Sequence, residues 1–380
     1  MTIPSQFDPI RPFEPEELPQ AYDLLLADEM FVGVIQKLYP GVPLAAIEQK
    51  MRMQKTNLDF QKAFCYDYLK QLLARASTGC DFDVSRISTQ GRYTFVSNHR
   101  DIVLDSALLE VLLVESGFDT TCEVAIGDNL LVYPWIRNLL RVNKSFIVER
   151  KPAIREMLAA SKRLSDYMHF VQAEKHDNVW IAQREGRAKD SDDRTQPSIL
   201  KMMAMGGEGS VKERLMQLHI VPLAISYEYD PCDYLKAQEF QQKRDNPEWK
   251  KSQADDVRSM LVGINGYKGY IHYQAAPCMD EWLSQLPDDT PKGEVFGVIA
   301  AEMDRRIFLN YRIYPCNRAA ARMQGMDVEA TGDELRQFGE YVDSRIALVD
   351  MPGKDEAFLR DQLINMYANP LRNHMAAQGQ

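Results

Sequence analysis

The stretch that decides the fold runs from Tyr93 to Leu113, YTFVSNHRDIVLDSALLEVLL. Its first residues, 93–96, are mostly apolar or aromatic, as in a buried strand, and residues 107–113 are apolar except for Glu110, as in a buried helix. A polar segment, residues 97–105, separates the two. The order predicts a strand that passes through a short loop into a helix, which is typical of an α/β protein.

The polar segment contains a histidine followed by two carboxylates. His99 stands at the exit of the predicted strand, and Asp101 and Asp105 follow it. A histidine whose tautomer is fixed by a carboxylate can take a proton from a substrate hydroxyl near neutral pH. Either aspartate is a candidate partner. Asn, Ser and Asp also cap helices, so the alternative is a helix N-terminus with an incidental histidine.

Composition limits the class of protein. The chain has 380 residues, of which 45% are hydrophobic and 26% charged, as expected for a folded protein of two or three units. A net charge of -10 argues against a general nucleic-acid binder. Apolar runs such as 130–136 are far shorter than the roughly 18–20 residues of a membrane span.

The cysteines and the first residues bear on location. Six cysteines are scattered without a Cys-x-x-Cys pair, which favours reduced thiols over disulfides or a zinc site. Residues 1–8 have neither the basic start nor the apolar core of a signal peptide. We therefore expect a cytoplasmic protein without a structural metal.

The pattern along the chain predicts three regions. Residues 1–85 read as a helical N-terminal domain, residues 86–290 as an α/β domain, and residues 291–380 as a helical extension. The predicted strands are 93–96, 121–126, 144–148, 178–182, 219–225 and 270–274. The predicted helices include one long helix at 44–76 and others near 106–115, 154–172 and 196–204, with a turn region at Gly263, Gly266 and Gly269. In the long helix, the stripe Phe60, Phe64, Tyr68 and Leu72 is interpreted as core packing.

Two further stretches suggest an anion site. Residues 137–163 contain eight Lys or Arg, Lys151 among them, against two Glu, although a solvated helix face is the commoner explanation of such a run. Residues 180–190, WIAQREGRAKD, lead from a predicted strand into a basic glycine loop, where an ordinary surface turn is the alternative. A fourth stretch, Val221-Pro222-Leu223, begins a buried strand with a proline.

The order of these four blocks resembles the glycerolipid acyltransferase family, which includes glycerol-3-phosphate and lysophosphatidate acyltransferases. The family pattern is Asn-His-x4-Asp, then Phe-Ile/Val-x-Arg, then Glu-Gly-x-Arg, then Val-Pro-x-x. The matching segments here are Asn98-His99 with Leu104-Asp105, Phe146 to Arg150, Glu185-Gly186, and Val221 to Leu223. The resemblance covers about residues 90–230, and the helical segment before it looks like that of soluble plastid glycerol-3-phosphate acyltransferases.

Three departures from the family pattern suggest a divergent branch. Five residues rather than four separate His99 from Asp105, a step that on an ideal helix would turn roughly 600° and place the two on different faces. A bulge must then return the carboxylate to the imidazole, and Asp101 remains a second candidate. The second block lacks its usual glycine, and Arg187 follows Gly186 directly, one position early.

The resemblance implies a mixed α/β sheet covered by helices and a fatty-acyl transfer to a hydroxyl. The donor would be acyl-CoA or acyl carrier protein, and the acceptor glycerol 3-phosphate or a lysophospholipid. His99 would be the general base and Asp105 its orienting partner, with no covalent acyl-enzyme, cofactor or metal. The residues assigned to substrate binding are Arg100, Lys144, Arg150, Glu185, Gly186, Arg187, Lys189 and Pro222.

The acyl chain and the lipid acceptor also need an apolar surface. Residues 128–141 place Leu, Trp and Tyr beside Arg, which suits a membrane interface, and a buried helix is the alternative. We therefore expect peripheral contact with the inner membrane and no nucleic-acid partner.

Other enzyme classes fit the sequence poorly. His99-Arg100-Asp101 looks like a protein-kinase catalytic loop, but Ser106 occupies the required Asn position and no Asp-Phe-Gly follows. The chain also has no Gly-x-Ser-x-Gly of a serine hydrolase. Two alternatives stay open, namely a lyso-aminolipid acceptor and a non-catalytic binder of lipid or acyl carrier protein.

Overall fold

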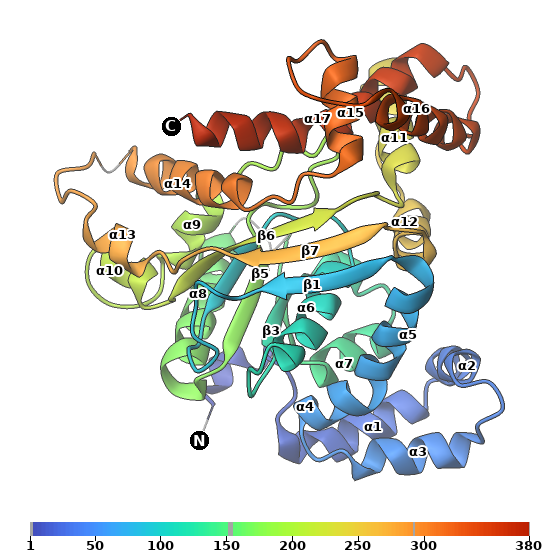
Figure 1. Ribbon diagram of the computed structural model, residues 1–380. Helices are drawn as coiled ribbons and strands as arrows, with labels where there is room; N and C mark the ends of the chain where they lie inside the picture. Colours follow the sequence, from blue (N-terminus) through green and yellow to red (C-terminus); the bar gives the residue numbers. More distant parts are fainter. Residues whose placement is uncertain (1–2, 151–154, 292, 380) are drawn as a thin grey trace.

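The computed structural model describes residues 3–150, 155–291 and 293–379. Within these residues seven strands form one sheet in the order β1-β7-β6-β2-β5-β3-β4 (Figure 1). The strands are β1 (Gly79–Asp83), β2 (Thr94–Ser97), β3 (Cys122–Gly127), β4 (Ser145–Val148), β5 (Asn178–Ala182), β6 (Ile220–Tyr227) and β7 (Tyr270–Ala275). All neighbours are parallel except β6 and β7. The predicted mixed α/β sheet is confirmed.

Helices cover the sheet and extend it at both ends of the chain. The N-terminal helices are α1 (Leu18–Leu26), α2 (Glu29–Leu38), α3 (Leu44–Met53), α4 (Asn57–Phe60) and α5 (Asp67–Ala76). The central ones are α6 (Leu104–Glu115), α7 (Pro134–Val142), α8 (Met157–Phe170), α9 (Pro197–Met203), α10 (Val211–Met216), α11 (Asp233–Asp245), α12 (Gln253–Asn265) and α13 (Asp280–Ser284). The last are α14 (Val295–Leu309), α15 (Pro315–Met323), α16 (Gly332–Ala347) and α17 (Glu356–Gln378). Short 3-10 or π turns are η1 (Ser5–Phe7), η2 (Pro15–Glu17), η3 (Gln61–Tyr66), η4 (Asp128–Leu130) and η5 (Val171–Lys175).

Strand β2 shows how the sheet is buried. Phe95 and Val96 are both inaccessible to solvent, yet they belong to different apolar clusters, because successive side chains of a strand point to opposite faces. The sheet is thus covered on both sides, and the continuous apolar runs that predicted the strands follow from that burial. Figure 1 places α1–α3 and α14–α17 on opposite sides of the molecule.

Two helical predictions need correction. Strand β1 lies within residues 1–85, which were predicted to be helical; its five residues at the sheet edge include two aspartates and give little apolar signal. The predicted helix 44–76 is interrupted after Met53, because the Thr56 side chain accepts from the Asp59 amide and starts a new helix. The aromatic stripe in that segment does pack in the core, as predicted.

The basic and glycine segments also differ in detail. Gly263 lies inside α12 rather than in a turn. Lys151 and the first residue of the predicted helix 154–172 fall outside the described residues, and the rest of that helix corresponds to α8 and η5.

Helix α7 carries the segment that we considered for membrane contact. Trp135 and Leu139 pack against the cluster formed by the N-terminal helices, and the Trp135 ring lies 6.0 Å from that of Phe31. Arg141 covers the ring of Phe13 at 4.1 Å. Much of the apolar face of α7 is therefore used inside the molecule, while Tyr133 remains exposed. In the described parts of the chain, no helix combines the length and the apolar character that a membrane crossing requires.

A buried carboxyl on α6 predicts a pH-dependent stability. Burial raises the pKa of Glu110 to about 8, although Asn143 Nδ2 donates to both of its oxygens at 3.2 and 3.3 Å. Between its unfolded pKa and about 8, the folded state holds a proton that the unfolded state has lost, so stability falls as pH rises through this window. We expect Glu110→Gln to match the parent at pH 4.5 and to exceed it at pH 8.5 by an amount on the order of a few kcal/mol. Thermal unfolding across this pH range measures the difference, and equal curves for the two proteins would contradict it.

Candidate active site

The histidine and the second aspartate of the polar segment are in contact. His99 follows the C-terminal end of β2, and its Nδ1 lies 2.8 Å from Oδ2 of Asp105 in the first turn of α6. The same oxygen accepts the backbone amides of Arg100 and Asp101 at 2.6 and 3.1 Å. Because α6 begins only at Leu104, the chain turns sharply before the helix, and the turn brings the carboxylate back to the imidazole.

Asp101 binds backbone amides at the start of α6 rather than the His99 ring. Its Oδ1 accepts the amides of Val103 and Leu104 at 2.9 and 2.8 Å, so it caps the N-terminus of α6. A Cβ on Gly263 would lie 2.0 Å from its other oxygen, so the glycine in α12 leaves room for this carboxyl. Burial and the neighbouring Asp105 raise the pKa of Asp101. Capping and histidine contact are thus divided between the two aspartates.

The residues before His99 hold the start of the loop on the sheet. The Asn98 side chain exchanges two hydrogen bonds with the backbone of Ile225 in β6, at 2.9 and 2.8 Å. Trp180 donates to Ser97 Oγ at 3.0 Å, and its ring meets that of His99 edge to face at 5.7 Å between centroids. The imidazole is therefore fixed by a carboxylate on one side and supported by an aromatic ring on another.

His99 opens into a cleft of about 510 Å³ at the carboxyl ends of the strands. The lining combines residues from the β4 exit, the loop after β5, and helices α11 and α12. Among the described residues, the basic side chains in this lining are Arg150, Arg184, Arg187, Lys189, Lys243 and Lys251, and the acidic ones are Glu185, Asp190 and Asp256. A local surplus of positive charge in a chain of net charge -10 favours an anionic ligand.

Five of the residues predicted to bind substrate, Arg150, Glu185, Gly186, Arg187 and Lys189, lie in this cleft. Gly186 has φ +68, a backbone conformation that favours glycine and lets the loop turn at the cleft wall. The Arg150 guanidinium lies 3.8 Å from the Glu185 carboxylate, and Lys189 contacts Glu239.

Two basic residues predicted to bind substrate are instead buried in ion pairs. Arg100 Nη2 lies 2.9 Å from Asp193, and the arginine is only 6% exposed. Lys144 lies 2.6 Å from Asp177 and is equally buried. Lys144 also precedes β4, so it lies at the amino-terminal ends of the parallel strands, whereas His99 follows the carboxyl-terminal end of β2. Their prediction as anion ligands was wrong, because each charge is neutralised by a carboxylate far away in sequence.

Pro222 is the third correction. It is buried within β6 beside Val96 of β2, and its carbonyl accepts from the Ala276 amide at 2.9 Å. The proline is tolerated because the ladder with β7 begins only at the next residue. It supports the sheet and does not face the cleft.

Lys243 and Lys251 were missed by the sequence analysis. They come from the end of α11 and the segment before α12, outside the four motif blocks. Only the local run of basic residues near 243–251 hints at them, and nothing in the sequence places that run beside His99.

Comparisons with known proteins give one family match and one similar solved structure. Residues 82–226 match the family model described as Acyltransferase. The chain is also similar to the 1-acyl-sn-glycerophosphate (LPA) acyltransferase PlsC of Thermotoga maritima, with 12% sequence identity, coverage of 77% of this chain and 94% of that one, and a TM-score of 0.37. No curated protein matches the chain. The family match spans the sequence from the end of β1 to β6, and this part of the chain is similar to the acyltransferase family that its four motif blocks resemble.

Proposed function

We propose that this enzyme transfers a fatty acyl group from acyl-CoA or acyl carrier protein to the hydroxyl of glycerol 3-phosphate or of a lysophospholipid. The observation that carries the proposal is the His99–Asp105 pair at the wall of a basic cleft. A base for a hydroxyl and positive charge for an acceptor phosphate then lie in one site.

In the proposed reaction, His99 acts as a general base through Nε2, because Nδ1 is held by Asp105. It takes the proton of the acceptor hydroxyl as the oxygen attacks the thioester carbonyl. The tetrahedral intermediate collapses with cleavage of the C–S bond, and the imidazolium returns the proton to the departing thiolate. The products are an ester and a free thiol. The buried Asp105 carboxylate stabilises the imidazolium while it exists.

The basic side chains would hold the acceptor so that its hydroxyl meets His99. Arg150 and Arg187 offer planar guanidinium groups that can bind phosphate through two hydrogen bonds each. Glu185 and Gly186 shape the loop between them.

Removal of one guanidinium is expected to weaken acceptor binding. Arg187→Ala should raise the KM for a phosphate acceptor by about 10- to 100-fold, since charge-assisted hydrogen bonds are worth about 1.5–3 kcal/mol. The KM for the acyl donor should change little, and initial-rate kinetics with each substrate varied separately measures both values. The matched control is Arg92→Ala, which removes an arginine paired with Asp119 away from the cleft. An unchanged acceptor KM in Arg187→Ala would remove this residue from the phosphate site.

The decisive test is acyl transfer by the purified protein. Radiolabelled palmitoyl-CoA and palmitoyl carrier protein serve as donors, and glycerol 3-phosphate, lysophosphatidate and a lyso-aminolipid as acceptors. A labelled product with a phosphate acceptor supports the proposal, and a product with the lyso-aminolipid alone would replace the acceptor. Lipid or carrier-protein binding without any product would indicate a binding protein. Cosedimentation with anionic vesicles tests the peripheral membrane contact that a lysolipid acceptor requires.

A further inference from the structure

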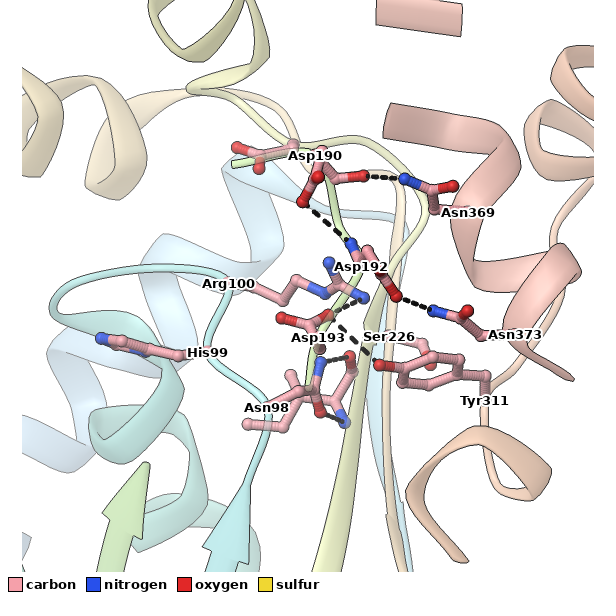
Figure 2. Close-up of polar contacts among 12 residues, drawn as sticks. Asn98, His99, Arg100, Asp190, Asp192, Asp193, Ser226, Tyr311, Asn369 and Asn373 are labelled. Atoms are coloured by element: carbon pink, nitrogen blue, oxygen red, sulfur yellow. Dashed lines mark hydrogen bonds and ion pairs between the residues drawn. The ribbon is translucent and has the colours of Figure 1, made fainter. Parts of the chain in front are cut away.

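The loop that carries the basic residues is tied to the C-terminal helix α17. This loop joins β5 to α9, and Figure 2 shows two asparagines of α17 reaching it. Asn369 Nδ2 donates to the Asp190 carbonyl at 2.7 Å, and Asn373 Nδ2 donates to the Asp192 carboxylate at 3.0 Å. Both asparagines are almost fully buried, and they lie one helical turn apart on the same face.

The buried carboxylate of Asp193 fixes the same loop through contacts with Arg100 and Tyr311. Asp193 is inaccessible to solvent, and its Oδ2 contacts the Arg100 guanidinium at 2.9 Å and accepts from the Tyr311 hydroxyl at 3.2 Å (Figure 2). Tyr311 comes from the segment between α14 and α15. Two residues further along, Thr195 donates from both its amide and its hydroxyl to Asp304 of α14, at 2.7 and 2.6 Å.

Arg100 connects this anchor to the catalytic pair. It is the residue after His99, and its backbone amide donates to Asp105 while its side chain holds Asp193. One residue therefore links the imidazole loop to the loop of Arg187 and Lys189. A buried charge left without its partner is costly, so the link resists distortion.

We infer that Asn369, Asn373 and Asp193 are positioning residues, which set the place of the basic loop relative to His99. The inference rests on the proposed function and extends it. The family match ends at residue 226, before Tyr311, Asn369 and Asn373. The C-terminal part of the chain would therefore influence acceptor binding at a site that lies mainly within the matched residues. Small displacements of binding groups have large kinetic effects, which makes such support consequential.

The test variant is Asn369→Ala with Asn373→Ala. Loss of two net hydrogen bonds should raise the acceptor KM by about tenfold, with kcat within about threefold of the parent. Amide hydrogen exchange in residues 184–193 should become faster, and more inorganic phosphate should be needed to protect these amides. The control is Asn365→Ala on the same helix, whose side chain contacts Gln324 and Arg372 rather than the loop.

A milder second variant covers the case in which the double variant fails to fold. Tyr311→Phe keeps the ring that lies 5.6 Å from the Arg100 guanidinium carbon and removes only the hydroxyl that donates to Asp193. It should shift the acceptor KM and loop exchange in the same direction by a smaller amount. Unchanged loop exchange and phosphate protection in the folded variants, or equal changes in Asn365→Ala, would overturn the inference. If the parent protein transfers no acyl group, the proposed function is wrong. The positioning role can still be tested, because amide hydrogen exchange in the loop and its protection by inorganic phosphate do not depend on acyl transfer.

Discussion

Replacement of His99 by alanine is expected to lower kcat for acyl transfer by about 10²- to 10⁴-fold, the usual contribution of a general base. Acceptor KM should stay within a few-fold of the parent, because the proposed phosphate site consists of residues from the loop after β5 and from the β4 exit, and not of His99. The side chain is partly accessible and packs only edge-on against Trp180, so the fold should tolerate its loss. Single-turnover measurement with labelled donor separates the chemical step from binding.

The chain offers a matched control for this experiment. His272 in β7 is also paired with an aspartate, through Nδ1 and Asp81 Oδ1 at 2.8 Å, and is similarly exposed. His272→Ala removes a histidine–aspartate pair between β7 and the edge strand β1, where the aspartate is partly exposed, and should leave kcat unchanged. Comparable losses in the two variants would show that His99 acts through stability rather than through catalysis.

Much of the sheet could be predicted because its strands are buried on both faces. In the run Asn178–Ala182, the four residues after Asn178 are apolar, and the predicted strand has the same bounds as β5. Strand β1 has no such signal, since it is a short edge strand whose pairing depends on β7, 191 residues later. The local sequence pattern therefore reveals strands that are buried on both faces. It does not reveal an edge strand that forms by pairing with a segment far away in the sequence.

In the candidate site, too, contacts between residues close in sequence could be predicted, and contacts between distant residues could not. His99 and Asp105 are close in sequence, and the turn that joins them is local. The basic segment 137–163 was read as one feature, yet β4 runs through it and separates Lys144 from Arg150 by the length of a strand. Among the described basic residues of this segment, only Arg150, at the carboxyl end of β4, lines the cleft. The partners that bury Arg100 and Lys144 are distant in sequence, so their pairing could not be foreseen.

Replacement of Asp105 by asparagine should greatly lower kcat, whereas the same replacement of Asp101 should leave kcat almost unchanged. Asp105→Asn is expected to lower kcat by about 10²- to 10⁴-fold, because a neutral amide cannot stabilise the imidazolium that forms when His99 takes a proton. The amide is similar in size and one oxygen can still accept the Arg100 and Asp101 amides, so the fold should be retained.

Asp101→Asn provides the contrast, since asparagine caps helices as well as aspartate does. Its side-chain oxygen can keep the bonds to the Val103 and Leu104 amides, and loss of a carboxyl next to Asp105 relieves repulsion between the two. We expect kcat within about twofold of the parent and an unchanged thermal midpoint. Parallel measurement of kcat and unfolding for both variants decides which carboxylate serves His99. A large loss of kcat in Asp101→Asn with activity retained in Asp105→Asn would reverse the assignment that the 2.8 Å contact supports.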